Sequence, residues 1–147
     1  MSISNRDITT HKFVAVLNKK IEPGKIMNAV GHMSLGIVAN ATPEELQLMN
    51  FVDYVDKEGG QHPSLSGNSY VILRADNSNQ IRAVRNAALT KGIHCIDFTN
   101  TMQEGTYLEQ LERTKATPEA ELEYYGICMF GEISEISEIT KKFSLWR

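Results

Sequence analysis

Residues 69–98 read SYVILRADNSNQIRAVRNAALTKGIHCIDF, and this stretch decides the fold. It begins with SYVIL and ends with IHCIDF, two β-branched and aromatic runs that are each typical of a buried strand. Between them, Ile81, Val84 and Ala88 recur at helical spacing. The polar cluster DNSN can cap that helix and Gly92 can end it. The stretch therefore predicts a βαβ unit with two parallel strands and a right-handed crossover.

The chain before this unit predicts a further strand and a long helix. Residues 12–17 (KFVAVL) form a short apolar run that is typical of a buried strand. An apolar set at helical spacing, which begins after a proline, predicts an amphipathic helix over residues 23–40. Its members are Ile26, Val30, Met33 and Ile37.

Residues 42–68 predict peripheral structure. Thr42 can cap a short helix whose first turn holds Pro43 and two glutamates. Residues 51–55 alternate apolar and polar side chains, as a strand does, and residues 57–68 (KEGGQHPSLSGN) are rich in turn-forming residues. We expect a peripheral strand followed by an exposed loop.

The last third of the chain predicts an insertion, a strand and a helix. Residues 104–121 are polar and charged with only a weak helical face, which favours a surface insertion. Residues 122–130 (LEYYGICMF) are typical of a strand and residues 132–143 of an amphipathic helix. We expect the tail SLWR to pack Trp146 on the body. No repeat or linker divides residues 1–147, so a single domain is predicted.

Composition excludes several classes of protein. The 147 residues carry a formal net charge of −3, so the chain as a whole does not attract nucleic acid. No apolar run approaches the roughly 18 residues that a membrane span needs. Residues 1–10 (MSISNRDITT) lack the basic start and apolar stretch of a signal peptide. We therefore expect a cytoplasmic protein with no membrane partner.

Cysteine and histidine spacing predicts neither a disulfide nor a metal site. Cys95 and Cys128 lie in apolar segments without a CxxC pair, which favours buried free thiols. The four histidines lack the spacing of metal ligands, so no metal or cofactor is expected. They are His11, His32, His62 and His94. The sequence also lacks a P-loop, GxGxxG and GxSxG, the signatures of nucleotide and serine-hydrolase chemistry.

The first candidate site is the loop of residues 18–25, where the helix over residues 23–40 begins. A helix N-terminus attracts anions, and three lysines add positive charge beside it. The residues concerned are Asn18, Lys19, Lys20 and Lys25. The alternative is that these lysines only solvate a loop.

The second candidate is a polar stripe on the same helix. Lys25, Asn28 and His32 are spaced i, i+3 and i+7, so they share one face. Small residues beside the stripe permit close approach of a ligand or another backbone. They are Gly31, Ser34 and Gly36. The alternative is that His32 is a hydrogen-bonded, partly buried histidine at a packing contact.

The third candidate is the polar cluster at the end of the strand IHCIDF, which begins within it at Asp97. Ligands of open α/β sheets commonly bind beyond the carboxyl ends of parallel strands. Asp97, Thr99 and Thr101 occupy such a place. The alternative is that they are ordinary turn and capping residues.

The ordered pieces of this chain resemble type II peptidyl-tRNA hydrolases. The resemblance covers most of the chain and includes KFVAVLN, the PGK loop, IMNAVGHMSLGIVAN and GICMFGEISEISEITKKFSLW. The chain is more similar to an uncharacterised family, the domain of unknown function family two thousand, through NAVGHMSLG, IDFTNTM and FSLWR. The resemblance implies a three-layer α/β/α fold with a mixed sheet of four or five strands and helices on both faces.

The same resemblance implies a divergent hydrolase that acts on an ester or amide. The catalytic residues would be Lys25, Asp97 and His32. Lys25 would bind an anionic group, and Asp97 would act as acid or base or orient water. The ligand-binding side chains would be Asn18, Lys19, Asn28, Thr99 and Thr101. Binding of tRNA would need a basic face built from Lys19, Lys20, Arg74, Arg82 and Arg85.

Two alternatives to a hydrolase stay open. The chain departs from the family pattern, because it lacks a second lysine beside Gly24-Lys25 and has Ala29 where the family helix has glutamine. Those departures favour a non-catalytic module that binds a small anionic ligand or a partner peptide, and they make tRNA a doubtful partner. The other alternative is a homodimer formed through the helix face that carries Gly31, Ser34 and Gly36.

Overall fold

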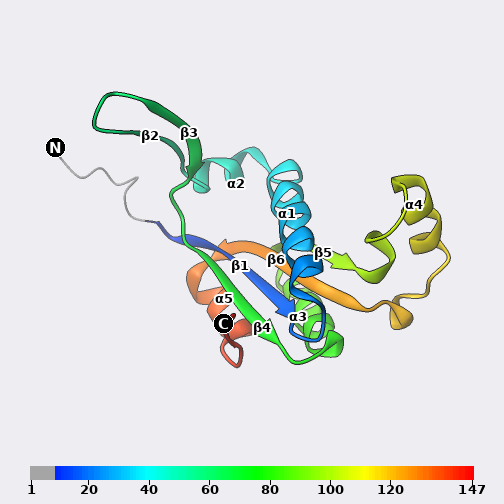
Figure 1. Cartoon of the computed structure of the whole chain (residues 1–147). Coiled ribbons are helices and arrows are strands. Elements are labelled where there is room, and N and C mark those ends of the chain that lie inside the picture. The colour runs from blue at the N-terminus through cyan, green and yellow to red at the C-terminus, as the bar shows by residue number, and fades with distance from the viewer. Residues whose placement is uncertain (1–8) are drawn as a thin grey trace.

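The computed structural model describes residues 9–147 (Figure 1). The strands are β1 (His11–Asn18), β2 (Phe51–Val55), β3 (Gln61–Ser66), β4 (Tyr70–Ala75), β5 (His94–Thr99), β6 (Tyr124–Glu132) and β7 (Ser144–Leu145). The α-helices are α1 (Pro23–Ala39), α2 (Pro43–Leu48), α3 (Ser78–Lys91), α4 (Tyr107–Lys115) and α5 (Ile133–Thr140). Two 3-10 turns, η2 (Asn100–Met102) and η3 (Glu119–Glu121), flank α4.

A mixed five-stranded sheet forms the centre of the molecule, in the order β5-β6-β1-β4-β7. Strand β4 runs parallel to β1, whereas β6 runs antiparallel to β1 and to β5. Strands β4 and β5 therefore point in the same direction, as the βαβ pattern predicted, although β1 and β6 lie between them. The predicted α/β class and mixed sheet of four or five strands are confirmed.

Helix α3 begins and ends where the sequence places its signals. The Asn77 side chain caps it by accepting a hydrogen bond from the Gln80 amide at 3.0 Å. Gly92 ends it with φ of 69°, a left-handed conformation that glycine adopts without strain. These local signals fix the connections on either side of the helix.

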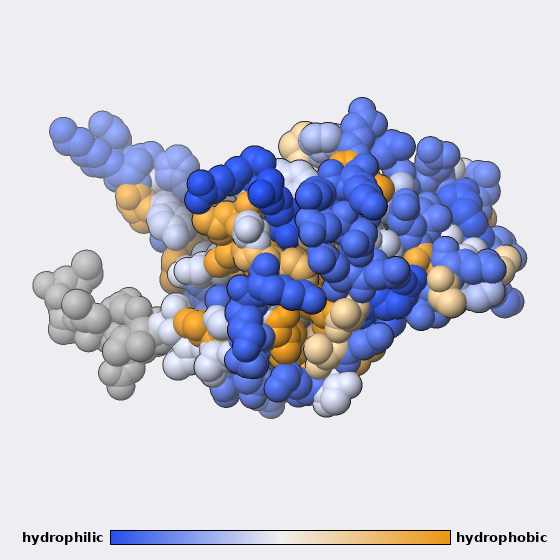
Figure 2. Space-filling view, turned by 90° about the horizontal axis from the view of Figure 1, so that it is seen from below, coloured by the Kyte–Doolittle hydropathy of each residue, from blue (hydrophilic) through white to orange (hydrophobic). Residues whose placement is uncertain are grey.

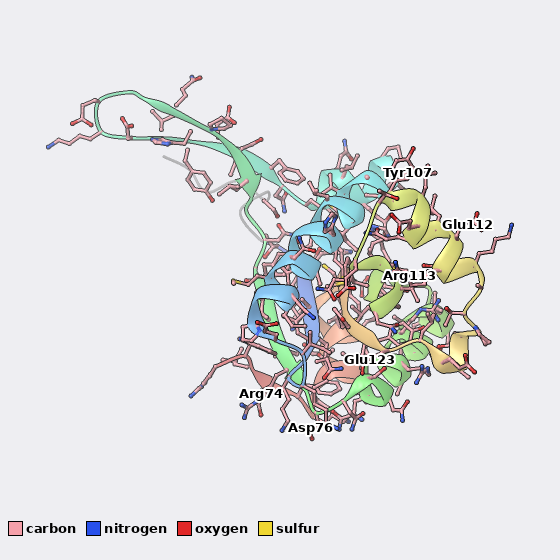
Figure 3. All side chains as sticks on the ribbon, turned by 45° about the vertical axis from the view of Figure 1, so that its right-hand side comes forward. Arg74, Asp76, Tyr107, Glu112, Arg113 and Glu123 are labelled. Carbon is pink, nitrogen blue, oxygen red and sulfur yellow. The ribbon has the colours of Figure 1, made fainter. Side chains whose placement is uncertain are left out.

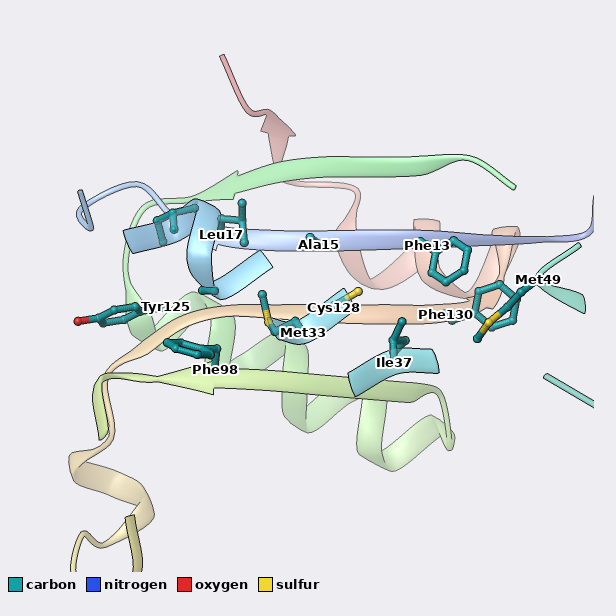
Figure 4. Packing of buried hydrophobic residues seen from close by; sticks show 12 residues of the cluster. Phe13, Ala15, Leu17, Met33, Ile37, Met49, Phe98, Tyr125, Cys128 and Phe130 are labelled. Carbon is teal, nitrogen blue, oxygen red and sulfur yellow. The ribbon is translucent and has the colours of Figure 1, made fainter. Parts of the chain in front are cut away.

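Alternate residues of β1 face two different helical layers. Phe13, Ala15 and Leu17 pack against α1, in a cluster that includes Met33 and Ile37 (Figure 4). The intervening side chains lie in a second cluster with residues of α3 and α5, because successive strand residues point to opposite faces. That second set comprises Val14, Val16, Ile81, Val84 and Ile136, among others. The sheet is thus buried between α1 on one face and α3 with α5 on the other.

Residues 57–68 are only partly a loop, which corrects the sequence-based expectation. Strands β2 and β3 pair antiparallel as a separate two-stranded sheet, and this hairpin projects from the body (Figure 1). All of β2 is exposed, as expected for a peripheral strand. The sequence of β3, QHPSLS, shows no apolar alternation and contains a proline, so its strand character comes from pairing with β2.

The insertion of residues 104–121 lies on the surface and contains α4, no residue of which is buried. Its predicted weak helical face is exposed: Tyr107 keeps 71% of its surface accessible, and Leu108 and Leu111 keep 60%. Figure 3 shows Tyr107 and Glu112 on α4, far from Arg74.

Among residues 9–147, no helix combines the length and apolar character that crossing a membrane requires.

Candidate functional site

The candidate residues lie in loops at one end of the sheet, where several strands begin or end. Strands β1, β4 and β5 all end there, and β6 begins there, because β6 runs against the other three. Asn18, at the end of β1, is 1% exposed. Its Nδ2 donates to the Tyr124 carbonyl at 3.1 Å, and its Oδ1 accepts from the Lys20 amide at 3.0 Å. Asn18 therefore holds the loop to β6 rather than facing a ligand.

Lys19 lies against the end of β4. Its Nζ is 2.8 Å from Oδ1 of Asp76, and both side chains are largely exposed. The hydrogen bond and charge of Lys19 lower the pKa of the Asp76 carboxyl from its usual value of 3.8. The two charges neutralise each other, so Lys19 contributes little free positive charge to an anion site.

The polar stripe on α1 lies along the flank that faces β5. Lys25 is half-buried, while Asn28 and His32 are exposed. The His32 ring stacks on Phe98, with ring centroids 5.9 Å apart and planes at 27°. Phe98 in turn lies 5.9 Å from the Tyr125 ring. His32 thus packs on an aromatic cluster, although it is not buried there.

Asp97 lies on the opposite face of the sheet from this stripe. Phe98 belongs to the cluster around α1, whereas Cys95 packs with the cluster around α3, and Asp97 alternates with Phe98. The Asp97 carboxylate accepts from Nε of Arg85 on α3 at 2.9 Å. The sheet therefore separates Asp97 from Lys25 and His32, and the three predicted catalytic residues do not share a pocket.

A cluster of charged and aromatic side chains surrounds this ion pair. Arg82 pairs with Glu119 at 2.8 Å, and the Tyr124 hydroxyl donates to Glu119 at 2.8 Å. The guanidinium carbons of Arg82 and Arg85 lie 5.1 and 5.8 Å from the Tyr124 ring centroid. Two of the five cations predicted to form a basic face for tRNA are thus neutralised here, and Lys19 is a third.

Thr99 and Thr101 are buried and bonded to each other rather than exposed to a cleft. Their hydroxyl oxygens are 2.8 Å apart, and the Thr114 hydroxyl donates to Thr101 at 2.8 Å. Thr114 belongs to α4, so this chain of hydroxyls fastens the insertion to the end of β5. The turn-forming interpretation of these threonines agrees with their contacts.

The small residues of α1 lie on different sides of the helix. Gly36 faces β5, where a Cβ would meet Cγ2 of Ile96 at 3.1 Å. Ser34 faces β4 and its hydroxyl lies 2.8 Å from that of Tyr70. Gly31 is exposed and has open space around it. Two of the three residues proposed for a dimer contact are therefore engaged within the chain.

Both cysteines are free thiols, as predicted, but only Cys128 is buried and Cys95 is partly exposed. Burial raises the pKa of Cys128 to about 11, and burial together with the charge of Asp97 raises that of Cys95. Raised values keep both thiols protonated and weakly nucleophilic at neutral pH. In the described part of the chain, no three His, Cys, Asp or Glu side chains come together as a metal site.

The other flank of α1 borders an apolar cavity of about 190 Å³ that is open to solvent on one side. Its walls come from the first two turns of α1, the end of β1, the middle of β4 and the C-terminal tail. The lining residues are Leu17, Pro23, Ile26, Met27, Val30, Ile72 and Trp146. The tail was predicted to pack Trp146 on the body, and it does, with the Trp146 amide donating to the Ile72 carbonyl at 2.9 Å.

A second cavity, of about 160 Å³ and polar, lies at the end of β4. It is lined by Arg74, Asp76, Gln80, Lys142, Phe143 and Ser144. Figure 3 shows Arg74 and Asp76 together at that end of the molecule. In Figure 2, which views the molecule from below, hydrophobic side chains reach the surface in the middle of the body among hydrophilic ones.

Sequence reasoning missed both cavities, because their walls combine β4 with a tail about half the chain away. The sequence predicted Arg74 only as part of a basic face, and residues 132–143 only as a helix. The one available signal was the apolar tail SLWR, since a tryptophan at a chain end needs a surface to pack on.

Comparisons with known proteins show the family and the fold but no activity. A solved structure, that of a protein of unknown function, Atu0240, from Agrobacterium tumefaciens strain C58, has 18% sequence identity and a TM-score of 0.79. The match covers 95% of this chain and 100% of that one, and at this identity it shows the fold alone. No curated protein matches the chain. A family model described as protein of unknown function (DUF2000) matches residues 11–147, and the chain belongs to that family.

Proposed function

We propose that this protein is a non-catalytic module that binds a small ligand with an apolar body and an anionic group. The observation that carries the proposal is the apolar cavity between α1, β4 and Trp146. Small-molecule sites are concave and mostly apolar, with a few polar groups that orient the ligand. This cavity is concave and apolar, and charged groups beside it can orient the ligand.

The size of the cavity limits the apolar body. A cavity of about 150 Å³ lined by aliphatic and aromatic side chains holds a benzene molecule in another protein. The cavity here, at about 190 Å³, accommodates a body of similar size. Its lining contains no carboxylate, thiol, hydroxyl, imidazole or amine, so it offers binding but no acid, base or nucleophile.

Positive charge beside the cavity supports an anionic group. Pro23, which lines the cavity, is in the first turn of α1, and the N-cap residue Glu22 makes no side-chain cap to that turn. The positive end of the helix dipole is next to the cavity, but the Glu22 carboxylate partly offsets it, so the main positive charge comes from Arg74. Arg74 pairs with Leu17 in the sheet and lies on the same face as Leu17 and Ile72. The cationic side chain of Arg74 thus lies beside the apolar wall of the cavity.

The hydrolase implied by the resemblance has less support. It needs Lys25, His32 and Asp97 in one pocket, and the sheet lies between Asp97 and the other two. Asp97 is already paired with Arg85, and both cysteine thiols have raised pKa values. The geometry therefore favours binding over bond cleavage.

The proposal can be tested through Trp146, the single tryptophan of the chain. Titration with benzoate is expected to change Trp146 fluorescence in a saturable way. Val30→Phe, which fills the cavity, should abolish the change. Val52→Phe, the same substitution on the exposed strand β2, should preserve it. Circular dichroism confirms that both variants fold.

Two results would contradict the proposal. One is a fluorescence of Trp146 that does not respond to benzoate or to uncharged aromatic probes. The other is release of free tRNA from a model peptidyl-tRNA by the wild-type protein, lost in Lys25→Ala and Asp97→Asn, which would establish the hydrolase instead.

We also propose that the arrangement is the three-layer α/β/α fold of type II peptidyl-tRNA hydrolases. Helices on both faces of a mixed five-stranded sheet support it. Superposition of an experimental structure on a member of that family, with strand order and direction compared, tests it.

A cytoplasmic location and a homodimer stay predictions. Fractionation of cells tests the location, and analytical ultracentrifugation tests the homodimer.

A further inference from the structure

The two cavities have no lining residue in common, but both include residues of β4 and of the C-terminal tail, beside the edge strand β7 of the sheet. Gln80 and Phe143 form the wall of the polar cavity on the side of α3 and α5. In the β4–β7 ladder, Arg74 pairs with Ser144, and the Trp146 amide bonds to the Ile72 carbonyl. Ile72 and Arg74 are two residues apart in β4, so their side chains point to the same face about 7 Å from each other. A small molecule that places its body beside Ile72 can therefore reach Arg74 with its other end.

The charges around the polar cavity favour an anion with two negative charges. Arg74 and Lys142 contribute two cations from two different elements. Asp76 is the one acidic side chain in the lining, and Lys19 lies 2.8 Å from its carboxylate. Lys19 neutralises Asp76, so Arg74 and Lys142 leave an excess of two positive charges at the cavity.

The lining also offers hydrogen-bond donors. Gln80 is engaged with Asp76, because its Oε1 accepts from the Asp76 amide at 2.7 Å and its side chain also bonds to the Asp76 carboxyl, so the donors left for a ligand come from Ser144 and Arg74. Ser144 contributes a hydroxyl, and the Arg74 guanidinium can hold two oxygens of one group. Donors from several directions suit a tetrahedral oxyanion better than a flat carboxylate with two oxygens.

We infer that the anionic group of the ligand is a phosphate monoester, which lies in the polar cavity between Arg74 and Lys142 while the apolar body lies against Trp146. This inference rests on the proposed function, since it uses the same apolar cavity for the body. It adds the chemical class of the ligand: a small aryl or alkyl phosphate. Phosphate monoesters carry close to two negative charges above their second pKa of about 6.

The test compares three probes that share one ring: phenyl phosphate, benzoate and benzyl alcohol. At about pH 8, where the phosphate is doubly charged, Trp146 fluorescence gives a Kd for each. We expect phenyl phosphate to bind at least about 10-fold more tightly than benzoate, a difference of about 1.4 kcal/mol. Inorganic phosphate should compete with phenyl phosphate and shift the amide NMR signals of Gln80 and Ser144.

Charge-removing variants locate the phosphate. Arg74→Gln and Lys142→Gln should each weaken phenyl phosphate binding by about 10-fold or more and leave benzyl alcohol binding unchanged, because each variant removes a charge-assisted contact to the phosphate and none to the ring. Lys57→Gln removes the same charge from the hairpin, far from both cavities, and should change neither Kd.

The outcomes separate this inference from the proposed function. If benzyl alcohol and benzoate bind but phenyl phosphate binds no more tightly, the phosphate inference is wrong while the binding module stands. The same holds if Arg74→Gln and Lys142→Gln leave the preference for phenyl phosphate intact. If no probe affects Trp146, the proposed function and the inference both fail.

Discussion

The Asp97 carboxylate lies 2.9 Å from Nε of Arg85, and both side chains are about one quarter exposed. The pair joins β5 to α3 on the face of the sheet that α1 does not cover. A charge-assisted hydrogen bond of this length, partly withdrawn from water, stabilises the fold more than an ion pair on the surface does. Asp97 is therefore expected to act as a structural residue.

Replacing Asp97 by alanine should lower the free energy of unfolding by about 1–3 kcal/mol, because Arg85 loses the partner of its charge-assisted hydrogen bond. Urea denaturation of Asp97→Ala, Arg85→Ala and the double variant measures the coupling between the two residues. Glu138→Ala, which breaks the exposed pair with Lys141, is the control and should cost less than about 1 kcal/mol. Equal losses in Asp97→Ala and Glu138→Ala would contradict the structural role.

The two glycines inside α1 should respond differently to alanine. Gly31 has open space around it, so Gly31→Ala should raise the free energy of unfolding by up to about 1 kcal/mol through helix propensity. In Gly36→Ala the new Cβ would meet Ile96 at 3.1 Å, so part or all of that gain should be lost. Thermal and urea unfolding of both variants provide the measurement. A larger gain for Gly36→Ala than for Gly31→Ala would refute the close packing of α1 on β5.

Much of the secondary structure could be predicted because its signals are local. Apolar spacing marked α1 and α3, and the Asn77 cap and Gly92 marked the ends of α3. Strand β3 could not be predicted, because its residues become a strand only by pairing with β2. The order of the sheet was equally hidden: β6 inserts between β5 and β1 from far along the chain.

The sequence predicted that the candidate residues gather at one end of the sheet, but not on which of its two faces each one lies. Polar residues do gather where β1, β4 and β5 end, as an α/β fold predicts. Whether Asp97 shares a face with His32 depends on which helix covers which side of β5, and no local pattern specifies that. The cavities depend on a tertiary contact between the C-terminal tail and β4, and the sequence of neither segment alone predicts that contact.

The buried threonines should hold the insertion in place. Thr101→Val keeps the shape of the side chain but removes the oxygen that bonds to Thr99 and Thr114. Leaving the fully buried Thr99 hydroxyl without this partner should cost about 1–3 kcal/mol and increase hydrogen exchange throughout α4. Thr90→Val, at an exposed position of α3, is the matched control. Unchanged exchange in α4 would show that other contacts fasten the insertion.

Tyr124 should make the protein sensitive to alkali. Burial and the hydrogen bond to Glu119 raise the pKa of Tyr124 from 10.0 to about 12. Between these values the unfolded chain has released the phenolic proton and the folded chain has kept it. The stability that Tyr124 contributes is therefore present below pH 10.0 and is lost as the pH rises toward 12.

Urea denaturation in steps between about pH 9 and 11 tests this linkage, because one retained proton contributes a slope of about 1.4 kcal/mol per pH unit. The free energy of unfolding should fall more steeply for the wild-type protein than for Tyr124→Phe, which has no phenolic proton to retain. Tyr107→Phe removes a hydroxyl that is exposed on α4 and should keep the wild-type slope. Parallel plots of unfolding free energy against pH for wild type and Tyr124→Phe would mean that Tyr124 has the same pKa in the folded and unfolded chain. The contacts with Glu119 and Arg82 would then not retain the phenolic proton of Tyr124.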